Sequence, residues 1–171
     1  RFTGPTGCCI AGTPFPVTPS GQSRSPCQKE PGVVGEAIIV VPCYNEAGRL
    51  DVEAYHRFLS GSDGVSLLFV DDGSTDRSLG ILAAREATGD VCVLRAEKRG
   101  AAAAMNQGIR QAAHPIICLV DQDVVLKPGW LVAVLGPFDD PAVGGVQGYF
   151  ITDPMAPVVA RVAGMDLEQR Y

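Results

Sequence analysis

From position 37 onward, short apolar runs alternate with segments in which apolar residues recur every three or four positions. Continuous apolar runs are typical of strands buried on both faces, and the longer spacing predicts helices with one apolar face. This alternation predicts an α/β fold, with a mostly parallel sheet flanked by helices. The predicted strands are residues 37–42, 65–70, 90–96, 115–120 and 142–150, and the predicted helices begin near positions 50, 75, 102 and 128.

The two ends of the chain differ from this middle part. Residues 1–36 are rich in Gly, Pro, Ser and Thr and show no sustained periodicity, so we expect a disordered or loosely packed leader. The composition changes at Ala37, where one folded domain is predicted to begin and to continue through 37–171. Its last stretch, residues 154–171, again has helical periodicity.

Composition narrows the function classes. The formal net charge of −5 argues against a nucleic-acid binder, because such proteins neutralise phosphates with Lys and Arg. An acidic protein can still bind a nucleotide when a metal ion bridges its carboxylates to the phosphates. No apolar run reaches the ~18–20 residues of a membrane-spanning helix, so no span is expected. Cys92 and Cys118 lie in strand-like runs and are expected to be buried free thiols, which favours a cytoplasmic location.

Acidic residues gather where three predicted strands end. The first strand is followed by Pro42 to Glu46, the second by Asp71 to Asp76, and the fourth by Asp121 to Asp123. In parallel sheets ligands bind beyond the carboxyl ends of the strands. Because clustered anions repel one another, a bound cation or hydrogen bonds to a ligand would offset the cost of this arrangement.

Asp121 and Asp123 are candidate metal ligands. In extended chain, residues two apart point the same way, so both carboxylates are expected to face one divalent ion, or one to face the ion and the other a ribose hydroxyl. Hard oxygen ligands favour Mg²⁺ or Mn²⁺. The alternative is an ordinary acidic turn that ends the strand.

The residues after the other strands also have two explanations each, a ligand-binding role and a purely structural one. Gly73 and the polar residues after it are explained by a tight turn and a helix cap, but the adjacent Asp71 and Asp72 are not, so one of them is a candidate acceptor for a nucleobase or ribose. Pro42 to Glu46 form either a plain loop or one wall of a nucleotide pocket, with Tyr44 against the base. Lys98 to Gly100 form either a solvated basic turn or a diphosphate contact at a helix start.

Taken together, these segments resemble glycosyltransferase family 2, which has the GT-A fold. The resemblance covers residues 37 to about 150 and corresponds to the N-terminal, donor-binding part of that family. Each motif is only moderately specific, but their order and spacing together are specific. The matching segments are VVPCYNE, FVDDGSTD, KRGAAAAMNQGIRQA, ICLVDQDV and KPGWLVAVLGPFDDPAVGGVQGYF.

The resemblance implies a site and a reaction. Asp72, with Asp71, would bind the nucleobase, and Pro42, Tyr44 and Glu46 would line the base and ribose. Arg99 would lie near the nucleotide, Asp121 would face the ribose or donor sugar, and Asp123 would hold Mg²⁺ or Mn²⁺ on the diphosphate. The implied reaction transfers a sugar, with inversion, from a UDP- or GDP-linked donor to a saccharide or lipid-linked acceptor. The implied location is the cytoplasm or the cytoplasmic face of a membrane.

The chain also departs from the family pattern. Ala101 stands where many relatives have a polar or basic residue. The resemblance places the general base in a later segment, so the domain is expected to be C-terminally incomplete and the catalytic base to lie beyond Tyr171. Donor binding without turnover, as a non-catalytic nucleotide-binding domain or an inactive truncated fragment, is therefore the alternative. None of the late acids is assigned as the base; they are Asp139, Asp140, Asp153, Asp166 and Glu168.

Overall fold

A computed structural model provides the structure of the chain. It describes residues 2–3, 8–11, 37–60, 62, 64–89, 91–149, 151, 154, 155, 158 and 161.

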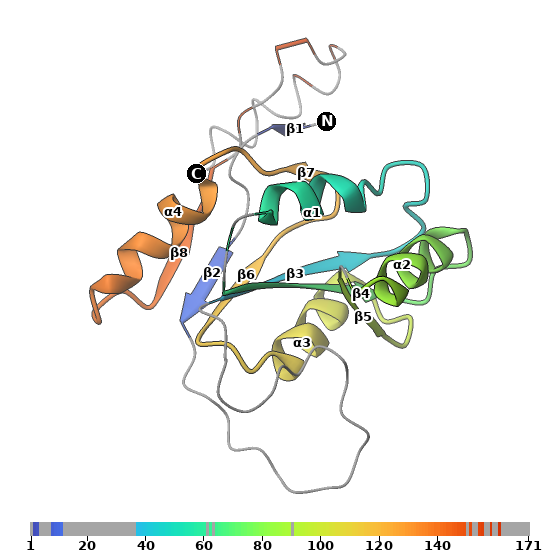
Figure 1. Ribbon diagram of the computed structural model, residues 1–171, viewed down its shortest axis with the longest axis horizontal. Coiled ribbons are helices and arrows are strands. Elements are labelled where there is room, and N and C mark those ends of the chain that lie inside the picture. Colours follow the sequence, from blue (N-terminus) through green and yellow to red (C-terminus); the bar gives the residue numbers. More distant parts are fainter. Residues whose placement is uncertain are drawn as a thin grey trace, which may run out of the picture.

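A six-stranded sheet with the order β5-β4-β3-β6-β2-β8 forms the centre of the molecule (Figure 1). Four neighbouring strands are parallel, and β2 pairs antiparallel with both β6 and β8. The prediction of a mostly parallel sheet flanked by helices is therefore confirmed. The strands are β2 (Cys8–Ala11), β3 (Ala37–Cys43), β4 (Val65–Asp71), β5 (Cys92–Arg95), β6 (Ile116–Leu119) and β8 (Gly145–Gln147), and β1 (Phe2–Thr3) pairs separately with β7 (Val124–Val125).

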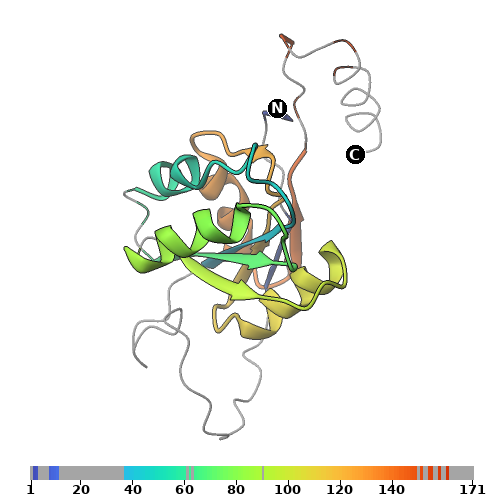
Figure 2. The same cartoon turned by 90° about the vertical axis from the view of Figure 1, so that its right-hand side faces the viewer.

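Helices cover both faces of the sheet (Figures 1 and 2). Alternate residues of the central strands point to opposite faces, so one strand feeds two cores. Ile39 and Phe69 belong to the core beneath α1, α2 and α4, whereas Val40 and Val70 belong to the core beneath α3. The helices are α1 (Val52–Leu59), α2 (Ser78–Ala87), α3 (Ala101–Gln111) and α4 (Trp130–Leu135), and α4 continues into the 3₁₀ helix η1 (Gly136–Asp139).

Helix α3 lies unusually close to the sheet at Gly108. A Cβ atom at this position would lie 2.5 Å from Cγ1 of Val40 and 3.1 Å from Cγ2 of Val70. Both distances are shorter than ordinary carbon contacts. The absence of a side chain therefore sets the height of α3 above the two central strands.

Several predicted boundaries were too wide. The predicted strands 90–96 and 142–150 shrink to β5 and β8, and α2 begins at Ser78 rather than near position 75. Residues 74–76 are not helical because Asn45 holds them in a loop: its Oδ1 accepts hydrogen bonds from the backbone N–H groups of Thr75 and Asp76. Most of the predicted helical tail lies outside the described residues.

The described residues include two short pieces of the predicted leader, residues 2–3 and 8–11. Cys8–Ala11 forms β2, which fills the place between β6 and β8. A four-residue strand is too short to give a periodic signal, and partners more than a hundred positions away determine its pairing. The rest of residues 1–36, apart from β1, lies outside the described part, so the boundary at Ala37 stays a prediction. Cys118 is a buried thiol as predicted, but Cys92 is disulfide-bonded, contrary to prediction. None of the described helices is long and apolar enough to cross a membrane.

Candidate functional site

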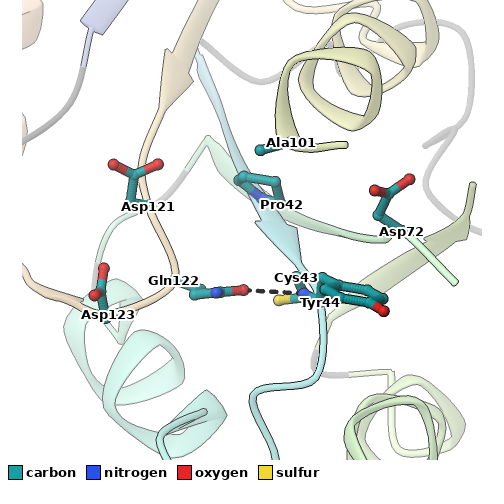
Figure 3. A pocket seen from close by; sticks show the side chains of 8 residues that line it. All are labelled: Pro42, Cys43, Tyr44, Asp72, Ala101, Asp121, Gln122 and Asp123. Atoms are coloured by element: carbon teal, nitrogen blue, oxygen red, sulfur yellow. Dashed lines mark hydrogen bonds between the residues drawn. The ribbon is translucent and has the colours of Figure 1, made fainter. Parts of the chain in front are cut away.

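The site lies where the order of the strands reverses direction. From β3 the chain adds β4 and β5 on one side and then returns to place β6 on the other side of β3. A crevice forms at the carboxyl ends of two neighbouring strands when the connections that follow them run to opposite sides. A pocket of about 150 Å³ occupies this place (Figure 3). It is lined by Pro42, Cys43, Tyr44, Asp72, Ala101, Asp121, Gln122 and Asp123.

Asp121 and Asp123 both line this pocket, and their role as metal ligands stays a prediction. The chain there is not extended: Val124 N–H donates to the Asp121 carbonyl over 3.2 Å and closes a turn. Figure 3 shows the two carboxylates on one side of the pocket and Asp72 on the opposite side. Partial desolvation, followed by the charge of Asp123, raises the pKa of Asp121. The turn therefore brings two like charges together.

Gln122, the residue between these carboxylates, joins the two strand ends. Its side-chain oxygen accepts a hydrogen bond of 3.2 Å from the backbone N–H of Tyr44 (Figure 3). Sequence reasoning treated Gln122 as a spacer and missed this contact. Only the position of Gln122 could have indicated this contact: Gln122 follows β6, and β6 lies beside β3, the strand that leads to Tyr44.

Tyr44 lies at the rim of the pocket beside a cation. The Lys98 ammonium lies 4.7 Å from the centre of the Tyr44 ring, within cation–π range. Arg99, the predicted nucleotide contact, is placed differently. Its guanidinium points into solvent and pairs with Glu97, and Arg99 is not among the residues that line the pocket. Lys98 is therefore the cation of this loop that lies closest to the predicted base site.

The two adjacent aspartates have different surroundings. Asp72 lines the pocket, and its carboxylate accepts hydrogen bonds from the backbone N–H groups of Arg99 (3.0 Å) and Gly100 (2.7 Å). It thereby ties the end of β4 to the start of α3. Asp71 is buried outside the pocket lining; one carboxylate oxygen accepts from Ser74 N–H, and the other has no hydrogen-bond partner among the described residues. A role of either residue in base binding stays a prediction.

Glu46, a predicted base and ribose contact, is bonded to other residues of the protein. It is buried, its backbone N–H donates to the Ser78 hydroxyl over 2.8 Å, and its carboxylate pairs with the Arg49 guanidinium. It is not among the residues that line the pocket. A second hydrogen bond, from Ala47 N–H to Asp76, joins the same two loops. The polar residues after β3 and β4 therefore hold these loops together, and this support positions Tyr44.

Cys43 adds a neutral wall to the pocket. Burial, followed by the charges of Asp71 and Glu46, raises the pKa of its thiol to about 12. A thiol with such a pKa stays protonated near neutral pH and is a poor nucleophile. Cys43 therefore contributes shape to the pocket and no reactive thiolate.

The donor set fits a magnesium-like cation that is bound together with a phosphate ligand. The described residues contain no cluster of three or more metal-binding side chains. However, Mg²⁺ is commonly held by one or two carboxylates together with substrate phosphates and water. Asp121 and Asp123 supply that number of carboxylates.

The described late acids do not add a base to the pocket. Asp139 lies in η1, and the Asp140 carboxylate accepts from Ala142 N–H over 2.9 Å, so both belong to the surface turn expected from the sequence. Asp153, Asp166 and Glu168 lie outside the described residues. No candidate for the general base emerges from the described part of the chain.

The sheet and the pocket at its strand reversal define an α/β ligand-binding domain of the doubly wound kind. Comparison with known proteins identifies its family. Residues 38–162 match the family model described as "Glycosyl transferase family 2". Because this match covers most of the chain, the protein belongs to glycosyl transferase family 2, and its fold is the GT-A type.

Two relatives that match this chain are longer than the chain itself. The pre-mycofactocin glycosyltransferase of Mycobacterium tuberculosis is 30% identical over 166 residues, which cover 91% of this chain and 31% of the relative. The poly-β-1,6-N-acetyl-D-glucosamine synthase of Staphylococcus aureus is 26% identical over 111 residues, 64% of this chain and 27% of the relative. The chain thus spans about a third of the length of these relatives.

One solved structure supports the fold directly. The crystal structure of residues 1–349 of S. aureus TarS superposes with a TM-score of 0.52 at 21% identity. The superposition covers 62% of this chain and 32% of TarS. At this identity the likeness concerns the fold alone.

Proposed function

We propose that this chain binds a nucleoside diphosphate sugar together with a divalent cation and serves sugar transfer, with inversion, to an acceptor hydroxyl. The observation that carries the proposal is the pocket at the strand reversal. There the aromatic end of β3 and the carboxylate turn after β6 face one cavity. Family membership supports the same reaction class.

The residues around the pocket suggest how the donor lies. The base stacks on Tyr44, beside Asp72, and the sugar and diphosphate extend toward Asp121 and Asp123. A divalent cation held by these two carboxylates would neutralise charge on the departing diphosphate. Ala101, the first residue of α3, lines the same cavity, and the start of a helix is a favourable place for a phosphate. The donor is UDP- or GDP-linked under this proposal.

The acceptor and the cellular location rest on family resemblance. We propose a saccharide or lipid-linked acceptor, and a cytoplasmic location or one at the cytoplasmic face of a membrane. By this reasoning the general base is contributed by a segment that the described residues do not include.

Isothermal calorimetry with UDP and GDP tests the donor and metal assignments. One of the two nucleotides should bind in the presence of Mn²⁺ or Mg²⁺, and a chelator should weaken binding at least about tenfold, because the phosphates otherwise meet two bare carboxylates. Asp123→Asn should cause a similar loss. Asp140→Asn is the matched control, since Asp140 serves a surface turn outside the pocket lining. Equal affinity with and without chelator would remove the metal from the proposal.

A further inference from the structure

The turn that carries the carboxylate pair is held by hydrogen bonds from distant parts of the chain. The carbonyl of Asp121 accepts two donors: Val124 N–H inside the turn at 3.2 Å, and the hydroxyl of Tyr55 at 3.0 Å. Tyr55 belongs to α1 and is 66 positions away in the sequence. The next residue, Gln122, reaches across to Tyr44 N–H. The turn is therefore fixed at two consecutive residues.

The ring of Tyr55 packs in the core, but the packing does not require its hydroxyl group. It is 4% exposed, and its ring packs edge-on against Phe69, with the ring centres 5.5 Å apart. Phenylalanine would make the same ring contact. Burial, followed by nearby Cys43, Asp123 and Asp121, raises the pKa of its hydroxyl, so the proton it donates is retained. What the hydroxyl adds is the bond to the Asp121 carbonyl.

These bonds counter a specific tendency of the turn. The carboxylates of Asp121 and Asp123 lie on the same side of the pocket, and like charges placed close together repel one another (Figure 3). The direction of the Asp121 carbonyl fixes the following peptide plane, and hence the directions in which the side chains of Asp121 and Gln122 leave the backbone. With both bonds present, the backbone of the turn cannot change its conformation at Asp121 or Gln122 without breaking a hydrogen bond.

We propose that Tyr55 and Gln122 are positioning residues that set the affinity of the carboxylate pair for a divalent cation. This inference rests on the proposed function, because it assumes that the pair holds a cation with the nucleotide. Groups that orient metal ligands typically change metal affinity by about 10–100-fold when removed. Gln122 additionally ties the orientation of the pair to the loop of Tyr44, on which the base is proposed to stack.

Electron paramagnetic resonance of free Mn²⁺ measures this directly. The chain is titrated with Mn²⁺ at saturating UDP or GDP, whichever the wild type binds, and the half-saturating concentration is read from the loss of signal beyond that caused by the nucleotide alone. Tyr55→Phe, which keeps the ring, should raise that concentration about tenfold. Gln122→Met, which keeps the length but removes the acceptor, should raise it similarly.

The matched control is Ser60→Ala at the end of the same helix. Its hydroxyl donates to the His56 carbonyl over 3.0 Å, so the variant loses one hydrogen bond of α1 without touching the turn. It should bind Mn²⁺ like the wild type, because the turn keeps both of its bonds.

The outcomes separate this inference from the proposed function. A wild-type chain that binds no Mn²⁺–nucleotide complex contradicts the proposed function itself. Wild-type binding with unchanged half-saturation in both Tyr55→Phe and Gln122→Met overturns the inference alone. A rise in one variant only removes the other residue from it, and a rise in Ser60→Ala equal to that in Tyr55→Phe assigns the effect to general loosening of α1.

Discussion

Replacing Gly108 by alanine should destabilise the protein through overpacking between α3 and the sheet. The new Cβ would lie 2.5 Å from Val40 Cγ1 and 3.1 Å from Val70 Cγ2. Val40 and Val70 are fully buried in the middle of the sheet, so neither side chain has space to turn away. Forcing extra carbon into a packed core costs about 1–3 kcal/mol. The helix must then rise or the strands must spread.

Thermal unfolding followed by circular dichroism measures the effect. For a chain of 171 residues, 1 kcal/mol corresponds to about 2–4 °C, so a cost of about 1–3 kcal/mol should lower the melting temperature by about 2–12 °C. Gly80→Ala is the matched control, because Gly80 also lies within a helix but a Cβ atom there would meet no other atom within 4 Å. It should be neutral or raise stability by up to about 1 kcal/mol, since alanine favours helix more than glycine does. If Gly108→Ala melts at or above the temperature of Gly80→Ala, the close approach of α3 does not limit the packing.

Three further predictions follow from particular contacts. Deleting residues 1–11 should lower the melting temperature, because β6 loses its antiparallel partner β2; an unchanged transition would mean that β2 adds nothing to the sheet. Acidification should weaken metal binding, and it should do so at a higher pH than for an ordinary aspartate, because the pKa of Asp121 is raised and binding needs the ionised carboxylate. Calorimetry at several pH values measures this transition. Asp123→Asn should shift the transition to lower pH. The same raised pKa means that the metal-free fold gains relative stability below the pKa of Asp121 and loses it as the pH rises through that value. Cys43 should resist thiol reagents in the native state and react only on unfolding, since it is 1% exposed and its pKa is about 12.

The sequence revealed those parts of the fold that depend on local pattern. Strands such as Ala37–Cys43 are continuous apolar runs because both of their faces are covered, and this burial produces a signal in one short window. Strand β2 produces no such signal, since four residues flanked by Gly and Pro are recognisable as a strand only beside β6 and β8. Its inclusion in the sheet is decided by distant partners.

The candidate site divides in the same way. Asp121 and Asp123 could be predicted because carboxylates after a buried strand have no packing role. Glu46 and Arg99 were assigned to the ligand through the family resemblance, and in the structure they form ion pairs with Arg49 and Glu97. A sequence does not show which of several polar groups finds a protein partner first.

The residues that sequence reasoning missed share a physical property: each acts through a contact with another loop. Gln122 matters because β6 lies beside β3, and Tyr55 matters because α1 lies behind the turn after β6. In the sequence, Tyr55 is one more apolar position of an amphipathic helix and Gln122 is one more polar residue of a turn. Residues that touch the ligand carry a chemical signature, whereas residues that hold those groups in place carry only a geometric one. The order of the strands in the sheet is therefore needed to predict which of the acidic motifs lie together. It places Asp121 and Asp123 in one pocket with Tyr44 and Asp72.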